Sequence, residues 1–119
     1  MKTHASDLLK IEIDETSESI VLKWLGKSTA RDPGDFIIPI LTDVIKKAGG
    51  DIHIILDFCD LEYMNSSTMT PISKILENAR SGISRVSIQY SKSVNWQELN
   101  FSALKIFETK DKRIEISGK

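Results

Sequence analysis

The sequence predicts an α/β protein built on a mixed β-sheet, with the helices mainly on one face of the sheet. Three observations lead to this fold class. Segments of alternating apolar and polar residues and segments of helical apolar spacing follow one another in the order β-β-α-β-α-β-α-β. After the opening pair of strands, helices and strands alternate, an order that implies right-handed parallel crossovers. Most strands are apolar on one side only, so we expect the second face of the sheet to be partly in contact with water.

Five strands are predicted from the alternation, over residues 10–14, 19–25, 51–58, 85–90 and 113–117. A short polar turn joins the first two, which are therefore expected to be antiparallel. The third is the most apolar and is predicted to be central. Residues 1–9 show no clear pattern, and we expect a loosely held start. The side chains expected to face the core are Ile11, Ile13, Ile20, Leu22, Trp24, Ile52, Ile54, Leu56, Phe58, Val86, Ile88, Tyr90, Ile114 and Ile116.

Three helices are predicted, over residues 36–48, from the hydroxyl-rich segment 66–70 to Ser81, and over residues 95–107. Pro39 is compatible with the first helix only if it lies in the first turn. Asn95 and Glu98 have the spacing of a capping box for the third helix. The expected buried side chains are Ile37, Leu41, Val44, Ile45 and Ala48, then Ile72, Ile75, Leu76 and Ala79, and finally Trp96, Leu99, Ala103 and Phe107.

Composition excludes several classes of function. The 119 residues suit one domain spanning the whole chain, and 40% of them are hydrophobic, which is enough for a core. The net charge of -1 provides no basic field for nucleic acid. One cysteine rules out a disulfide within the chain, and two isolated histidines offer no metal-ligand spacing. With no signal-peptide pattern and no bilayer-spanning apolar run, we expect a cytoplasmic protein that binds neither nucleic acid nor membrane and carries no cofactor.

A dense cluster of hydroxyls, Ser66, Ser67, Thr68 and Thr70, lies where the third strand gives way to the second helix. Functional groups collect at such strand-to-helix junctions, and the free N–H groups of a first helical turn favour an anion. A phosphate on one of these hydroxyls would therefore be accepted by the helix. Serine and threonine are also preferred helix N-caps, and spacing alone favours that interpretation.

The segment that precedes this helix resembles the signature loop of STAS domains, the anti-sigma factor antagonist family. The residues that carry the resemblance follow the Leu56-Asp57-Phe58 strand end, and they are Leu61, Tyr63, Met64, Asn65, Ser66 and Ser67. The order of elements is also similar to that of a single-domain STAS protein, so the resemblance covers nearly the whole chain. It implies a STAS-like fold in which the hydroxyl after the Asp/Asn position is the phosphoacceptor. In this chain that residue is Ser66, with Ser67 and Thr68 as alternates.

The resemblance also implies partners. A serine kinase of the histidine-kinase ATPase type, which acts as the anti-sigma factor, would phosphorylate the loop, and a PP2C-type phosphatase would reverse the reaction. Two residues depart from the family pattern: Asn65 replaces the usual aspartate, and Thr68 replaces the commonest glycine. The loop is also similar to the Leu-Asn-Thr-Ser-Ser loop of a SiaC-like subgroup of bacterial regulatory phosphoproteins, whose members switch a diguanylate cyclase. The partner is therefore expected to be one of these two kinds of protein.

We expect a non-enzymatic, partner-switching regulatory protein. In this hypothesis the surface around Ser66 binds the partner, and phosphorylation releases it by adding charge at the interface. The expected partner-binding residues are Asp57, Tyr63, Met64, Asn65, Ser67, Thr68 and Met69. One alternative is a STAS-like scaffold or ligand-binding module that is never phosphorylated. Another is a hydrolase with Ser66 as nucleophile, for which only His4 or His53 is available as a base.

Overall fold

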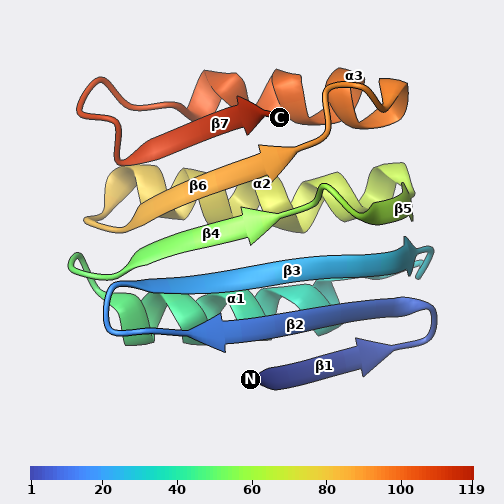
Figure 1. Cartoon of the computed structure of the whole chain (residues 1–119), viewed down its shortest axis with the longest axis horizontal. Coiled ribbons are helices and arrows are strands. Elements are labelled where there is room, and N and C mark those ends of the chain that lie inside the picture. Colours follow the sequence, from blue (N-terminus) through green and yellow to red (C-terminus); the bar gives the residue numbers. More distant parts are fainter.

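The computed structural model describes residues 1–119 and contains one seven-stranded sheet, three α-helices and one 3-10 helix (Figure 1). The strands are β1 (Lys2–Ser6), β2 (Leu9–Glu15), β3 (Ser19–Ser28), β4 (His53–Asp57), β5 (Leu61–Met64), β6 (Arg85–Tyr90) and β7 (Ile114–Gly118). The helices are α1 (Gly34–Ala48), α2 (Ser66–Ser81) and α3 (Asn95–Ser102), and α3 continues into the 3-10 helix η1 (Ala103–Phe107).

The strands lie in the order β1-β2-β3-β4-β6-β7, and β5 pairs with β3 away from this path. β1 is antiparallel to β2 and β2 to β3, whereas every later pairing is parallel. This arrangement confirms the predicted mixed sheet, its antiparallel hairpin and its parallel crossovers. The carboxyl ends of β3, β4 and β6 consequently meet at one edge of the sheet, where β5 and the start of α2 also lie (Figure 1).

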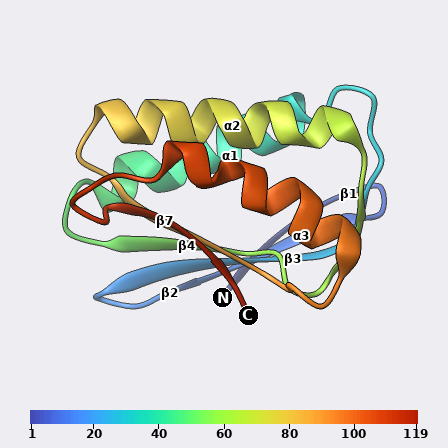
Figure 2. The ribbon, with the colours of Figure 1, turned by 90° about the horizontal axis from the view of Figure 1, so that it is seen from above.

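All the helices cover one face of the sheet, and the other face is open (Figure 2). The strand side chains predicted to face the core are buried, with the exception of Ile52, which is partly buried against it. Half-buried residues of the opposite side, such as Lys23, Ile55 and Asp57, lie on the open face. The one-sided alternation in the sequence is therefore the direct cause of a sheet with helices on a single face.

The start of the chain forms an edge strand, so the expectation of a loosely held start was wrong. β1 pairs with β2 in register from Lys2 opposite Ile13 to Ser6 opposite Leu9. Asp7, with a φ of 52°, makes the tight turn between them. The sequence pattern did not predict β1, because an edge strand with mainly polar side chains has no apolar alternation. The turn packs closely against β3: a Cβ on Gly26, whose φ is +83°, would lie 2.1 Å from the carbonyl oxygen of Leu8.

Two details of the predicted helices were also wrong. α1 begins at Gly34, so Pro39 is its sixth residue and lies beyond the first turn. Pro39 therefore removes one hydrogen bond from the helix interior, at the carbonyl of Asp35. The N-cap of α3 is Val94, without a side-chain hydrogen bond, and Asn95 does not cap the helix.

The buried side of the last helical segment is turned by about one residue from the predicted side. Its fully buried side chains are Gln97, Phe101 and Leu104, whereas Leu99 is 75% exposed. Ala103 is exposed, and Trp96 and Phe107 are only partly buried against the core. Phe101 stacks on Phe58 with ring centroids 4.5 Å apart, and this aromatic contact fixes the orientation of α3.

Candidate functional site

The candidate site lies where β5 leads into α2, at the carboxyl edge of the sheet. β5 pairs with the end of β3, with Gly26 opposite Leu61 and Ser28 opposite Met64, and the register shifts after Gly26. The expected short loop is thus partly a strand, because β3 runs three residues beyond its predicted end at Leu25. The pairing anchors the residues just before α2 to the backbone of the sheet.

Asn65 is the N-cap of α2, so the interpretation of the Ser and Thr hydroxyls as caps was wrong. Its Oδ1 accepts a hydrogen bond from the backbone N–H of Thr68 at 3.1 Å. Its Nδ2 donates to the carbonyl of Ala30 at 2.9 Å, and its own N–H donates to the carbonyl of Ser28 at 2.9 Å. One side chain therefore caps the helix and ties it to the segment between β3 and α1.

Thr68 completes a buried polar network beneath the start of α2. Its side chain is fully buried, and its hydroxyl donates to Oδ1 of Asn65 at 2.7 Å. That hydroxyl lies 2.7 Å from Oγ of Ser28, which is 2% exposed. Because the single Thr68 proton is already engaged, Ser28 is the donor in this contact. Thr68 is consequently neither an accessible alternate phosphoacceptor nor a partner contact, and both of those predictions were wrong.

Ser66 and Ser67, by contrast, are both exposed and occupy the first two positions of α2. Successive helical residues point about 100° apart, so the two hydroxyls face different directions. Ser67 and Thr70 line a polar hollow of about 580 Å³ between the starts of α1 and α2, which Arg31 and Lys74 also line. The first turn of α2 contains no acidic residue. Its free N–H groups and dipole are thus available to an anion on either serine.

The other predicted partner-binding residues divide into exposed and buried groups. Tyr63 is 48% exposed beside the serines, whereas Met64 is only 7% exposed and belongs to the core. Met64 therefore cannot be a direct partner contact, and that prediction was wrong. Met69 is half-buried against the core, and Asp57 lies half-buried at the end of β4. The Asp57 carboxylate accepts the backbone N–H of Cys59 at 3.0 Å, which stabilises the turn that leads toward β5.

Gln97 supports the same turn from α3 and was missed by the sequence analysis. Its side chain is fully buried. Its Nε2 donates to the carbonyls of Phe58 at 2.8 Å and Leu61 at 3.0 Å, and its Oε1 accepts from the N–H of Ser91 at 2.7 Å. A glutamine in a short amphipathic segment gives no sequence signal for such a role, because its partners are backbone groups far along the chain.

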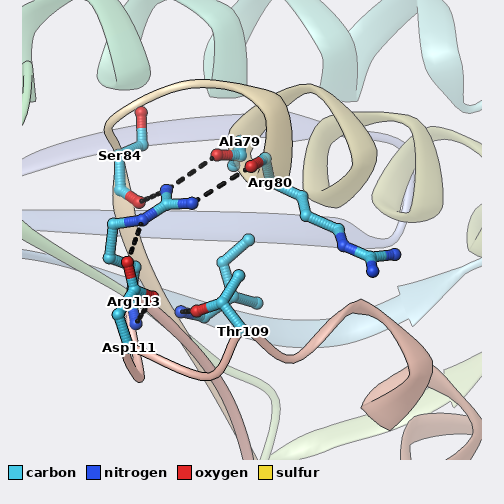
Figure 3. A network of polar contacts seen from close by, with 7 residues as sticks. Ala79, Arg80, Ser84, Thr109, Asp111 and Arg113 are labelled. Carbon is cyan, nitrogen blue, oxygen red and sulfur yellow. Dashed lines mark hydrogen bonds and ion pairs between the residues drawn. The ribbon is translucent and has the colours of Figure 1, made fainter.

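The far end of α2 is held by Arg113, just before β7 (Figure 3). Its Nη1 donates to the carbonyls of Ala79 and Ser84, both at 3.1 Å, and its Nη2 donates to the carbonyl of Arg80 at 3.0 Å. Nε of Arg113 lies 3.0 Å from Asp111, whose pKa is lowered to about 2 by the hydroxyl of Thr109 and by Arg113. A cation at the carboxyl end of a helix is favoured by the dipole. Both ends of α2 are therefore fixed by side chains from other elements.

Other candidate chemistry lies away from Ser66. Nε2 of His53 lies 2.7 Å from Oγ of Ser87 on the open face, so the serine that contacts this histidine is Ser87 and not Ser66. His4, the other histidine, lies on β1. Burial, followed by the charge of Arg85, lowers the pKa of His53. Burial raises the pKa of the Cys59 thiol to about 11, and Asp57 adds to this shift. No group of three His, Cys, Asp or Glu side chains is placed to hold a metal ion.

None of the helices combines the length and the apolar character that crossing a bilayer requires.

Comparison with known proteins identifies the fold. No protein-family model matches the chain, and no curated protein matches it significantly. The crystal structure of an uncharacterized protein of the DUF3478 family from Shewanella loihica, which has a SpoIIAA-like fold, is similar with a TM-score of 0.59 at 17% identity. The similarity covers 98% of this chain and 92% of that one.

This chain has a SpoIIAA-like fold. At such low identity the similarity establishes the fold alone. The STAS-like fold implied by the loop residues is thereby confirmed, since SpoIIAA-like and STAS-like describe the same architecture of mixed sheet and one-sided helices.

Proposed function

We propose that the chain is a regulatory phosphoprotein whose binding to a partner protein is switched by reversible phosphorylation of Ser66, with Ser67 as the alternate acceptor. One observation carries the proposal. Ser66 is exposed at the first position of α2, while Asn65 just before it and Thr68 two positions after it are held by a buried network. An enzyme can reach the hydroxyl without any part of the fold opening.

The fold is suited to accept the phosphate. A phosphoserine carries about -1.5 to -2 charges at neutral pH, and such a group is stabilised at a helix N-terminus. The N–H groups of Ser66 and Ser67 come before the first intrahelical hydrogen bond, and no acid in the first turn competes for them. Phosphorylation therefore changes the charge of the surface and leaves α2 folded.

The partner would bind the exposed residues around the acceptor, Tyr63, Ser66, Ser67 and the accessible part of Met69. A phosphate in the middle of this contact must lose water when the partner docks, and it repels acidic groups there. A typical coupling of about 1–3 kcal/mol would lower the affinity roughly 5- to 150-fold. The family resemblance suggests a serine kinase of the histidine-kinase ATPase type or a diguanylate cyclase as partner, and a PP2C-type phosphatase for the reverse step.

Both departures from the family pattern have a structural role that fits this proposal. Asn65 caps α2 as an aspartate would, and its NH₂ group also donates to the carbonyl of Ala30, which an ionised aspartate cannot do. Thr68 places its hydroxyl in a buried contact with Ser28, where glycine would leave Ser28 without this acceptor. Asn65 and Thr68 therefore change which contacts hold the start of α2, and they leave Ser66 exposed.

The proposal is tested by affinity capture from the native cell with wild type, Ser66→Ala, Ser66→Asp and the control Ser17→Asp in the exposed β2–β3 turn. We expect wild type, Ser66→Ala and Ser17→Asp to retain the same partner, and Ser66→Asp to lose it with an unchanged circular dichroism spectrum. Equal retention by Ser66→Asp and Ser17→Asp would contradict switching at this serine. Peptide mass spectrometry of the native protein separates the switch from a scaffold that is never phosphorylated.

A further inference from the structure

The sheet has two edge strands, β1 and β7, and the chain covers the edge at β7 (Figure 1). The hydroxyl of Thr109 accepts the backbone N–H of Ile114 at 3.1 Å, and the carboxylate of Glu108 accepts that of Ile116 at 3.0 Å. The N–H of Thr109 also donates to the carbonyl of Ile114 at 3.3 Å. Because these backbone groups already have partners, they are not free to pair with a further strand.

The edge at β1 is open to strand pairing. β1 pairs only with β2, in continuous register over its five residues, so the N–H and C=O groups along its outer side face solvent. Proteins block such an edge with proline, a bulge or charged side chains, and of these β1 has only Lys2, at its start. Its side chains on the open face of the sheet, Thr3 and Ala5, are short and exposed. A further strand can therefore approach β1 along its whole length.

Exposed apolar side chains lie at both ends of this edge. Met1, just before β1, is 86% exposed, and Leu8, in the turn after it, is 62% exposed. The carbonyl of Leu8 accepts the N–H of Lys27 on β3 at 3.0 Å, so the turn that carries this leucine is fixed to the sheet. Single exposed apolar residues are ordinary on a protein surface. Here the two flank a free strand edge, one at each end.

We propose that β1 is the interface of a homodimer, in which the β1 strands of two copies pair antiparallel about a two-fold axis and join the two sheets into one. The two-fold register that pairs all five residues places His4 opposite His4 of the second copy, Lys2 opposite Ser6, and Thr3 opposite Ala5. Met1 of each copy then lies beside the turn that carries Leu8 of the other. This inference does not depend on the proposed phosphorylation of Ser66.

Two features favour a second copy over a strand from another protein. Antiparallel pairing of β1 with itself brings the apolar residue at one end of the edge to the apolar residue at the other end, and it does so twice, as a two-fold interface requires. The pairing also uses the open edge of both sheets. Because the contacts of Glu108 and Thr109 cover β7 in each copy, no open edge remains and the assembly closes at two chains.

The first test measures self-association of the full chain by sedimentation across concentration. We expect wild type to form a dimer and no larger species, and Leu8→Asp to weaken dimerisation at least tenfold, because an apolar contact is lost at both ends of the interface. The matched control Leu99→Asp replaces a leucine of α3 that is 75% exposed, and it should dimerise like wild type. Thermal melting verifies that each variant is folded. A wild type that is monomeric at about 1 mM, or Leu8→Asp that dimerises as well as Leu99→Asp, would overturn the proposal.

Disulfide cross-linking tests the register in the background Cys59→Ser, which removes the native thiol. Opposite residues of antiparallel strands have Cα atoms about 4.5–5.5 Å apart, within the range of a disulfide. Air oxidation should therefore link His4→Cys to its second copy, and should link an equimolar mixture of Lys2→Cys and Ser6→Cys. Lys2→Cys alone should stay unlinked, because its two copies lie about 13 Å apart along the strands. Linking of His4→Cys no faster than that of Lys2→Cys would overturn the proposed pairing.

Discussion

Replacing Thr68 by valine removes one hydroxyl from beneath the candidate site with almost no change in side-chain shape. In the native chain this hydroxyl donates to Asn65 at 2.7 Å and accepts from Ser28 at 2.7 Å. Both Thr68 and Ser28 are essentially inaccessible to water, at 0% and 2% exposure. The variant therefore leaves the Ser28 hydroxyl buried without its partner, and it also removes one of the contacts that orient the Asn65 cap.

The expected cost follows from these two losses. Loss of the hydrogen bond to Asn65 lowers the free energy of unfolding by about 1 kcal/mol. The Ser28 hydroxyl, which is left buried without a hydrogen-bond acceptor, lowers it by about 1–2 kcal/mol more. We therefore expect Thr68→Val to lower the free energy of unfolding by about 2–3 kcal/mol. For a domain of this size that corresponds to a fall in Tm of roughly 8–12 °C. Ser28→Ala should cost only about 1 kcal/mol, because Thr68 keeps its own acceptor in Asn65.

Urea unfolding followed by circular dichroism measures these differences, and a double-mutant cycle isolates the contact. The variant Ser28→Ala/Thr68→Val should lose about 1 kcal/mol less than the sum of the two single variants, because no buried hydroxyl is stranded in it. Thr70→Val, an exposed position one residue beyond the first turn, is the matched control and should change stability by less than about 0.5 kcal/mol. A Thr68→Val variant as stable as this control, or strictly additive costs, would refute the network.

Three further predictions concern the surroundings of the site. Arg113→Met should destabilise the fold by about 2 kcal/mol, because three carbonyls at the end of α2 and the following turn lose their donor; a urea midpoint equal to that of the exposed-surface control Arg80→Met would count against this. The Asp111 carboxyl should titrate near pH 2 by NMR. Because its pKa is lowered on folding, its stabilising effect is present above about pH 4 and is lost as the pH falls toward 2, and a midpoint near 4 would show that the contacts of Asp111 do not persist in solution. The Cys59 thiol, with its pKa raised to about 11, should alkylate at pH 9 at least tenfold more slowly in the folded chain than in urea, and a half-maximal rate near pH 8.5 when folded would contradict its burial.

The sequence predicted the architecture well where a local pattern reflects burial. Alternation located the five strands of the main sheet path that follow β1, and one-sided alternation predicted the open face. Helical spacing gave the correct buried side of α2, with Ile72, Ile75, Leu76 and Ala79 all in the core. These signals succeed because each depends on residues a few positions apart that face the same environment.

The remaining features depend on contacts between distant residues. β1 and β5 are short strands whose place is set by backbone pairing with β2 and β3, and their side chains carry little pattern. The burial of Thr68 requires Ser28, forty positions earlier, and the role of Gln97 requires the carbonyls of Phe58 and Leu61. Four neighbouring hydroxyls looked equivalent in the sequence, whereas the structure buries Thr68 and exposes Ser66 and Ser67. Side-chain chemistry alone cannot separate them, because only packing decides which hydroxyl meets water.

Peptide mass spectrometry of the chain purified from its native cell, with and without phosphatase treatment, shows directly whether Ser66 is phosphorylated. We expect a phosphate on Ser66, or on its alternate Ser67, that disappears on treatment and is absent from Thr68, whose hydroxyl is buried. In the variant Ser66→Ala the phosphopeptide should be lost or reduced to the Ser67 form. A chain that carries no phosphate under any growth condition, or carries it only outside the first two positions of α2, would rule out a switch at Ser66 or Ser67.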